Sequence, residues 1–273
     1  MKKFEGILLC TDLDGTLYSS DKSVSQKNLD AIEYFKSEGG LFTFITGRVP
    51  LISKDICRIT KPNAPFGCSN GGAIYDHVRD QYLWYLTLDR DAMELVRAVD
   101  EQLPEIGIQL NTEQNIYFCK NNSATARFRA ITGIPDIYAD YMQNEEPLLK
   151  VLFADSDPKN IERLACLLDS LPGAEKYDFI RSEATLYEIM PKGASKGGAL
   201  LKLCELLSID PRRTVAVGDY YNDISMIRAA GAGFAVANAV DEAKRVADHI
   251  TVSNNEGAIG DIIERLDRGK LKL

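Results

Sequence analysis

The sequence has few histidines, no closely paired cysteines and no long apolar run. His77 and His249 are its two histidines, and both lie outside the motifs described below, so zinc binding and histidine-based catalysis have little support. The six cysteines are widely spaced without a Cys-x-x-Cys pair, which predicts reduced core residues. No stretch approaches the roughly 20 apolar residues of a membrane span, and the first apolar run is too short for a signal peptide. We therefore expect a cytoplasmic protein without a membrane partner.

Positive charge is also scarce. Lys and Arg number 32 against 40 Asp and Glu, so the net charge is −8. Nucleic acid is therefore not expected as a partner, and any anion must be bound by local groups. The 273 residues, 45% of them hydrophobic, suit one large globular domain or two smaller ones.

The pattern of apolar runs divides the chain into an outer and an inner part. Both ends alternate short apolar runs with helical periodicity, which predicts a doubly wound, Rossmann-like α/β core around a parallel sheet. Between Gln81 and Ile189 the runs favour an antiparallel sheet with three helices. We predict a discontinuous core of residues 1–80 and 190–273, with an α+β domain inserted at 81–189.

Two strand-like runs end in pairs of aspartates. In "LLCTDLDGTL", Asp12 and Asp14 follow the apolar run, and Asp219 and Asp223 follow the run "TVAVG". Residues i and i+2 of a regular strand point to the same side, and ligands of open α/β sheets bind at the carboxyl ends of the strands. The four acids could therefore converge on a cation, and oxygen ligands favour Mg²⁺ over zinc. The alternative is that they form an Asp-Gly turn and a helix N-cap.

Two further segments have the chemistry of anion binding. Thr46 and Gly47 follow "LFTFI" and offer a hydroxyl and a backbone N–H to a phosphoryl oxygen, although they could instead form a simple turn. Lys196 follows the predicted N-cap Ser195. A cation is disfavoured at that end of the helix dipole, so a lysine there suits a bound anion in front of it.

In order and spacing these segments resemble the four motifs of the haloacid dehalogenase-like (HAD) hydrolase superfamily. The motifs are Asp12-Leu13-Asp14-Gly15-Thr16, Thr46-Gly47-Arg48, Lys196, and Gly218-Asp219-x-x-Asn222-Asp223. The segments "CSNGGAIYD" and "EIMPKGASKGGAL" are similar to the Cof-type sugar-phosphate phosphatases, whose α/β cap is inserted after the second motif. The resemblance covers essentially the whole chain.

This resemblance implies a Mg²⁺-dependent phosphatase that acts on a small phosphorylated metabolite, such as a sugar phosphate. Asp12 would be the nucleophile that becomes an aspartyl phosphate, and Asp14 the general acid and then the base. Mg²⁺ would be held by Asp12, the backbone carbonyl of Asp14, Asp219 and Asp223.

The resemblance also assigns phosphoryl binding and leaves other roles open. Thr46, Gly47, Lys196 and Asn222 would hold the phosphoryl oxygens, with Thr46 and Lys196 among the catalytic residues. Arg48 either reaches the substrate or forms a surface ion pair. Transfer to a sugar by a phosphomutase or phosphotransferase, and a non-catalytic phosphate sensor, are the competing functions. In the inserted domain we expect aromatic residues to form core contacts and Arg127, Arg129 and Lys150 to be solvated.

Overall fold

The computed structural model describes residues 2–271, which divide into two compact units. The first comprises Met1–Trp84 with Ser195–Leu273, and the second comprises Tyr85–Ala194. The sequence-based division lies four residues before the first of these boundaries and five before the second. The first difference arises because strand β5 (Gln81–Tyr85), expected in the inserted domain, pairs with β4 of the first unit.

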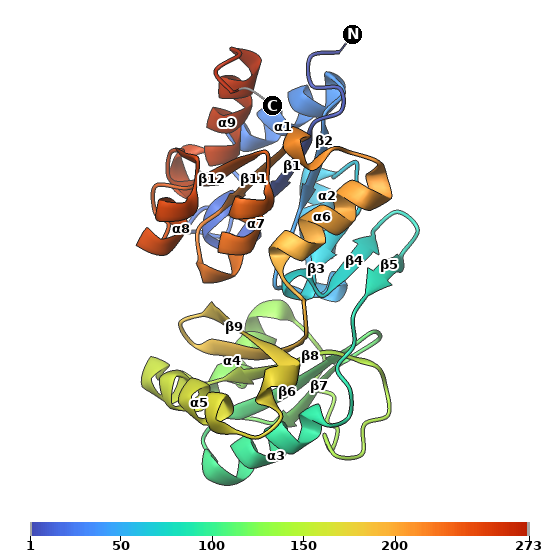
Figure 1. The fold of residues 1–273 in the computed structure, drawn as a ribbon, viewed down its shortest axis with the longest axis vertical. Coiled ribbons are helices and arrows are strands. Elements are labelled where there is room, and N and C mark those ends of the chain that lie inside the picture. Colours follow the sequence, from blue (N-terminus) through green and yellow to red (C-terminus); the bar gives the residue numbers. More distant parts are fainter. Residues whose placement is uncertain (1, 272–273) are drawn as a thin grey trace. The chain divides into compact units, whose positions relative to one another are not determined.

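The first unit holds a parallel sheet in the order β13-β12-β11-β1-β2 and a small sheet in the order β3-β4-β5 (Figure 1). Its strands are β1 (Leu8–Thr11), β2 (Leu41–Phe44), β3 (Phe66–Cys68), β4 (Ala73–Asp76), β5, β11 (Thr214–Gly218), β12 (Ala232–Ala235) and β13 (His249–Ile250). Its α-helices are α1 (Gln26–Ser37), α2 (Lys54–Thr60), α6 (Lys196–Leu207), α7 (Ile224–Ala229), α8 (Asp241–Val246) and α9 (Ala258–Asp267).

Helices cover both faces of the parallel sheet. Leu9 of β1 packs in one buried cluster with residues of α1 and α9, whereas its neighbours Leu8 and Cys10 pack in another with residues of α6 and α7. This alternation follows from the two-residue period of a strand, and burial on both faces explains why the strands are continuously apolar. The sequence offers Ser23 and Ser25 as caps for the first helix, and Ser25 caps α1 by accepting a hydrogen bond from the Asn28 N–H. The arrangement confirms the expected α/β fold class.

The second unit is an α+β structure whose antiparallel sheet has the order β7-β6-β8-β10-β9. Its strands are β6 (Gly107–Thr112), β7 (Ile116–Lys120), β8 (Leu148–Ala154), β9 (Tyr177–Glu183) and β10 (Leu186–Pro191), and its α-helices are α3 (Ala92–Gln102), α4 (Ser123–Thr132) and α5 (Pro158–Ser170). Helices α3 and α5 pack on one face of this sheet, where they bury apolar residues of β6 and β8. Among residues 2–271, no helix is both long and apolar enough to cross a membrane.

Three side chains depart from what the sequence suggested. Lys150 of β8, expected to be solvated, is buried and pairs with Glu188 of β10 at 2.8 Å. Its neighbour Val151 packs with α3 and α5, so the two-residue period of the strand directs Lys150 to the other face of the sheet, where Glu188 balances its charge. Cys166 is exposed on α5 rather than buried in a core. Tyr82 packs edge-on against Tyr75 within the first unit, so its contacts are those of a core residue outside the inserted part.

Candidate functional site

Two acidic loops meet at the carboxyl edge of the parallel sheet. Strands β1 and β11 are parallel neighbours, so Asp12 and Asp219, which follow them directly, lie at the same edge. Gly15 turns the chain with a φ of 79°, and a Cβ atom there would lie only 2.4 Å from an Asp219 carboxylate oxygen. Glycine is thus required both by the backbone conformation and by the close approach of the second acidic loop.

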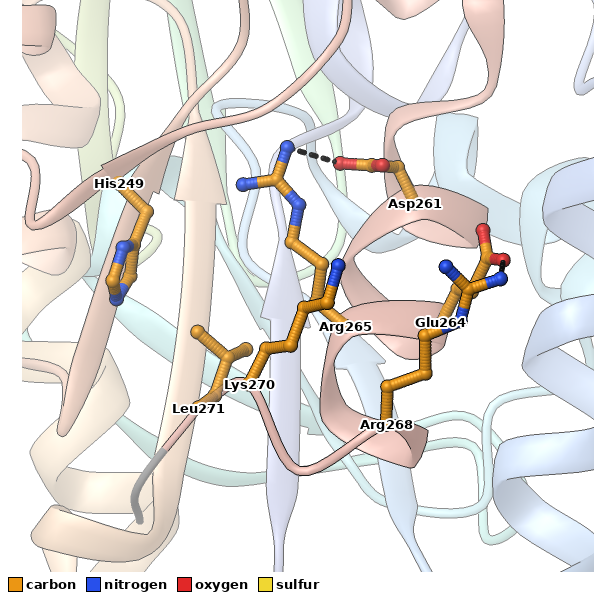
Figure 2. A pocket seen from close by; sticks show the side chains of 7 residues that line it. All are labelled: His249, Asp261, Glu264, Arg265, Arg268, Lys270 and Leu271. Carbon is orange, nitrogen blue, oxygen red and sulfur yellow. Dashed lines mark hydrogen bonds and ion pairs between the residues drawn. The ribbon is translucent and has the colours of Figure 1, made fainter.

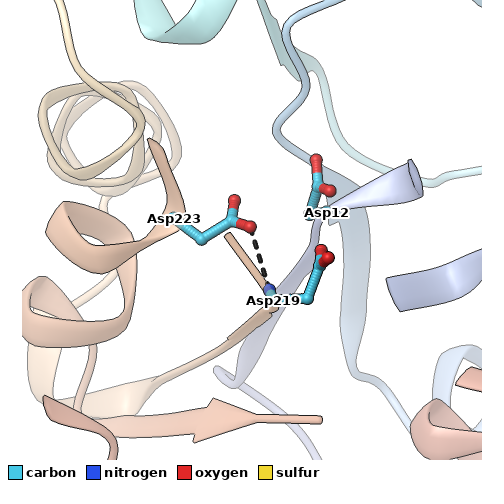
Figure 3. A group of neighbouring side chains, drawn as sticks. All are labelled: Asp12, Asp219 and Asp223. Atoms are coloured by element: carbon cyan, nitrogen blue, oxygen red, sulfur yellow. Dashed lines mark hydrogen bonds between the residues drawn. The ribbon is translucent and has the colours of Figure 1, made fainter. Parts of the chain in front are cut away.

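Three carboxylates converge at this edge. One oxygen each of Asp12, Asp219 and Asp223 lies within 4.8 Å of the other two (Figure 3). Asp223 is fixed in place because its Oδ2 accepts hydrogen bonds from the backbone N–H groups of Asp219 at 2.9 Å and Tyr220 at 3.0 Å. Thr16 holds the Asp219 carboxylate by a hydrogen bond of 2.9 Å. An Asp-Gly turn and a helix N-cap, the alternative roles for these aspartates, therefore do not account for their arrangement, because Asp12, Asp219 and Asp223 also form a cluster.

Lys196 supplies the positive charge of the cluster. Ser195 caps α6 by accepting from the Gly198 N–H, as predicted, and places Lys196 in the first turn. The lysine is 1% exposed, and its Nζ lies 2.6 Å from an oxygen of both Asp12 and Asp223. Burial lowers the pKa of Lys196, but its attraction to Asp12 and Asp223 outweighs burial and raises that pKa above its ordinary value. The lysine is therefore charged.

The cluster carries an excess of negative charge. Burial and the neighbouring Asp223 carboxylate raise the pKa of Asp12 well above its ordinary value, and the same two causes raise that of Asp219 to about 7. One lysine faces three carboxylates, so a divalent cation is the group that would complete the charge balance. The donor set consists only of oxygens, which fits Mg²⁺ and does not suit zinc.

Asp14 does not point its side chain into this cluster. Strand β1 ends at Thr11, so the same-side argument for residues two apart does not extend to Asp14. Its carboxylate instead accepts from Arg48 Nε at 2.9 Å and Nη2 at 2.8 Å, and from Lys22 Nζ at 2.9 Å. Burial raises the pKa of Asp14, but the hydrogen bonds and charge of Arg48 outweigh it, so the net shift is downward. Arg48 thus forms an ion pair, as one alternative held, with a motif residue as its partner.

The segments expected to bind phosphoryl oxygens lie at the same edge. Thr46 is buried directly after β2, and its hydroxyl accepts from the Arg48 N–H at 3.2 Å. Asn222, on the loop after β11, donates from Nδ2 to Oδ1 of Asn70 at 2.9 Å. Asn70 is not among the predicted site residues. The Asn-Gly-Gly run that follows a predicted strand is the sequence feature that could have indicated it.

A groove of about 410 Å³ lies elsewhere, between β13 and α9 (Figure 2). Four of the charged residues that line it are paired with each other: Arg265 with Asp261 at 2.7 Å, and Arg268 with Glu264. His249 also lines it and packs against Phe234. None of the predicted site residues lines this groove, so it gives no support to a second site for the same chemistry.

The raised pKa of Asp219 predicts how the metal-free protein responds to pH. Between its ordinary value of 3.8 and its folded value of about 7, the folded chain holds a proton that the unfolded chain has released. The free energy of unfolding in EDTA should therefore fall as pH rises from about 4 to about 7. Because Mg²⁺ must displace this proton, its apparent affinity should fall about tenfold for each pH unit below about 7.

Thermal unfolding in EDTA and titration with Mg²⁺, each at several pH values, measure both effects. The variant Asp219→Asn should weaken the dependence on pH in EDTA, because an amide has no proton to release, while the raised pKa of Asp12 preserves the remainder. A Mg²⁺ affinity that is the same at acidic and alkaline pH would contradict this prediction.

Comparison with known proteins bears directly on this geometry. The model of the haloacid dehalogenase-like hydrolase family matches residues 9–263. The chain belongs to this family. The match includes all four predicted motifs and the inserted unit, and it agrees with the likeness to the Cof-type branch.

Several relatives of this HAD-like hydrolase are named as phosphatases. It is 27% identical over 289 aligned positions to the 5-amino-6-(5-phospho-D-ribitylamino)uracil phosphatase YwtE of Bacillus subtilis, covering 96% of this chain and 98% of that protein. A HAD-like hydrolase from Bacteroides thetaiotaomicron has a similar fold, with a TM-score of 0.83, 24% identity and coverage of 95% and 99%. The fold is also similar to that of the HAD subclass IIB sugar phosphatase BT4131, with a TM-score of 0.83, 20% identity and coverage of 96% and 99%. This HAD-like hydrolase is a phosphatase.

Proposed function

We propose that this phosphatase hydrolyses a small phosphorylated metabolite, a sugar phosphate, with Mg²⁺ and through an aspartyl phosphate on Asp12. The observation that carries the proposal is the buried group of Asp12, Lys196, Asp219 and Asp223 at the carboxyl edge of the parallel sheet. A phosphate ester is negatively charged, so it binds where positive charge lies near the nucleophile. This group contains a carboxylate nucleophile, the cation Lys196 and the oxygen ligands for a divalent metal ion.

In the first step an oxygen of Asp12 attacks phosphorus, and the bond from phosphorus to the ester oxygen breaks. The leaving alcohol takes a proton from Asp14, which must first be protonated and leave its ion pair with Arg48. In the second step Asp14 takes a proton from water, whose oxygen attacks phosphorus, and the Asp12 carboxylate is released with inorganic phosphate. Asp14 thus ends protonated, as it began.

Other residues hold the phosphoryl group during both steps. Thr46, the Gly47 N–H, Lys196 and Asn222 donate hydrogen bonds to its oxygens, which offsets the charge that spreads over them in the transition state. The carboxylates of Asp12, Asp219 and Asp223, with the backbone carbonyl of Asp14, would hold Mg²⁺, whose charge favours phosphate binding and the approach of the nucleophile. The chain can then bind an anionic phosphate ester despite its net negative charge.

The leaving group is proposed from the chemistry of the named relatives. The substrate named for YwtE has its phosphate on a ribityl chain, and BT4131 is named as a sugar phosphatase. Both place a phosphate on a chain that carries several hydroxyl groups. We propose the inserted unit, Tyr85–Ala194, as a cap that selects such leaving groups and excludes water, and a cytoplasmic location because the cysteines are widely spaced and unpaired.

A panel of phosphorylated metabolites with Mg²⁺ tests this function through the release of inorganic phosphate. We expect pentose, hexose and polyol phosphates to be hydrolysed with a kcat/KM at least about tenfold above that of p-nitrophenyl phosphate, a difference of about 1.4 kcal/mol in transition-state binding. Hexose phosphates must yield free phosphate, because an isomeric phosphate as product would show a phosphomutase. Saturable binding without turnover would show a sensor.

A further inference from the structure

A short turn after β3, Ser69–Gly71, contacts the loops that follow β2 and β11. The backbone N–H of Asn70 donates to the Thr46 carbonyl oxygen at 3.0 Å. The Asn70 side chain reaches the other loop, where Oδ1 accepts from Asn222 at 2.9 Å. Two of the proposed phosphoryl-binding residues, 176 positions apart in the chain, are therefore linked through one buried asparagine.

The same turn packs against the residue that carries the site's positive charge. A Cβ atom on Gly71 would lie 2.0 Å from the Ser195 carbonyl oxygen and 2.7 Å from the Lys196 nitrogen. The turn is thus in close contact with the start of α6, which holds the Lys196 side chain against Asp12. Three segments assigned to phosphoryl binding meet at this turn.

The backbone of the turn is held in an uncommon conformation. Ser69, Asn70 and Gly71 have φ angles of 49°, 53° and 89°, and the first two side chains are fully buried. Left-handed backbone at residues other than glycine is uncommon, and asparagine is one of the few that tolerates it. Such conformations persist where the surrounding structure fixes them, and they concentrate at functional sites.

We propose that Asn70 is a positioning residue for phosphoryl binding, acting through Asn222 and Thr46. This inference rests on the proposed function. By accepting from Nδ2 of Asn222, Asn70 fixes which end of that amide is the donor. The Nδ2 group has two protons, so one remains for a phosphoryl oxygen. Without the acceptor the Asn222 amide can rotate and present its oxygen, which repels a phosphoryl oxygen.

The variant Asn70→Gly separates this role from a purely structural one. Glycine adopts a φ of 53° readily, so the turn is kept while the side-chain acceptor is lost. With p-nitrophenyl phosphate as substrate we expect kcat/KM to fall about tenfold, and the inhibition constant of inorganic phosphate to rise by a similar factor. The same loss is expected for Asn222→Ala, and the double variant should be no worse than Asn222→Ala alone.

Asn63→Ala provides a matched control. The Asn63 side chain also holds a backbone segment of the first unit, accepting from Phe42 N–H at 2.8 Å and donating to the Gly40 carbonyl at 3.0 Å, but it does so at the amino end of β2. Its loss should lower the melting temperature, and any effect on kcat/KM should add to that of Asn222→Ala.

Asn70→Asp gives a second measurement should the glycine variant fail to fold. Aspartate also tolerates the left-handed conformation and keeps the acceptor, but it adds a negative charge beside the phosphoryl site. KM should rise about tenfold at low and at high salt alike, because salt screens a buried charge only weakly.

Additive effects of Asn70→Gly and Asn222→Ala would overturn the role of Asn70 alone. An Asn70→Asp enzyme with unchanged KM would overturn it as well, because residue 70 would then not lie beside the phosphoryl site, as the proposed role requires. A wild-type protein that neither hydrolyses phosphate esters nor binds inorganic phosphate would overturn the proposed function, and with it this inference. The two failures are therefore distinguishable.

Discussion

Replacing Asp12 with asparagine should lower turnover of p-nitrophenyl phosphate by at least about four orders of magnitude, because the amide cannot form the covalent intermediate. The substitution keeps the shape of the side chain and its place at the end of β1. It also removes a carboxylate whose pKa is raised by burial and by Asp223, so the metal-free protein should be at least as stable as the wild type at alkaline pH. Steady-state kinetics and thermal unfolding in EDTA measure these two effects.

Asp261→Asn is the matched control for this variant. Asp261 is also a partly buried aspartate of the first unit, but it pairs with Arg265 of α9 in the remote groove. Its loss should cost some stability and leave turnover within about twofold of wild type, since exposed or partly exposed ion pairs contribute little. If Asp12→Asn keeps its activity towards the aryl phosphate, the nucleophile is another group.

The sequence was sufficient to predict the fold because its signals are local. Continuous apolar runs between periodic helical segments predict a doubly wound sheet, and Ser25 and Ser195 are found at the helix starts where their spacing suggests. The sequence-based assignment of β5 to the inserted domain was wrong. Strand β5 pairs instead with β4, the strand that precedes it in the chain, and forms the edge of the small sheet. Pairing of this kind depends on tertiary contacts that periodicity does not encode.

The sequence predicted part of the proximity among the candidate residues and few of their contacts. Proximity of Asp12 to Asp219 follows from neighbouring parallel strands, but the separation of Asp12 from Asp14 depends on where β1 ends. The helix-dipole argument suggested an anion in front of Lys196, and the structure places two carboxylates of the protein there. The contact between Asn70 and Asn222 joins residues 152 apart, which no local pattern could indicate.

Lys196→Met should have the second large effect, and it should separate the folding role of the lysine from its catalytic role. Removing the ammonium group leaves the buried carboxylates of Asp12 and Asp223 without their cation. Breaking one side of a buried pair costs about 3 kcal/mol or more, so the metal-free variant should be destabilised by about that amount at alkaline pH. Turnover should fall about a thousandfold, because a donor to the phosphoryl oxygens is lost.

Mg²⁺ and acid should each restore the stability of Lys196→Met without restoring its turnover. A divalent cation among the three carboxylates offsets their repulsion, and it stabilises the fold by binding only the folded chain. At lower pH the folded variant keeps a proton on Asp12, whose pKa is already raised by burial, so the loss of stability should shrink as pH falls.

Lys202→Met is the matched control. Lys202 lies on the same helix and pairs with Glu205 near the surface, so its replacement should change neither stability nor turnover appreciably. If Lys196→Met is as stable as wild type in EDTA at alkaline pH, the lysine does not balance the acid cluster. If Mg²⁺ restores turnover together with stability, then Lys196 organises the site, and the phosphoryl oxygens are held by the other donors.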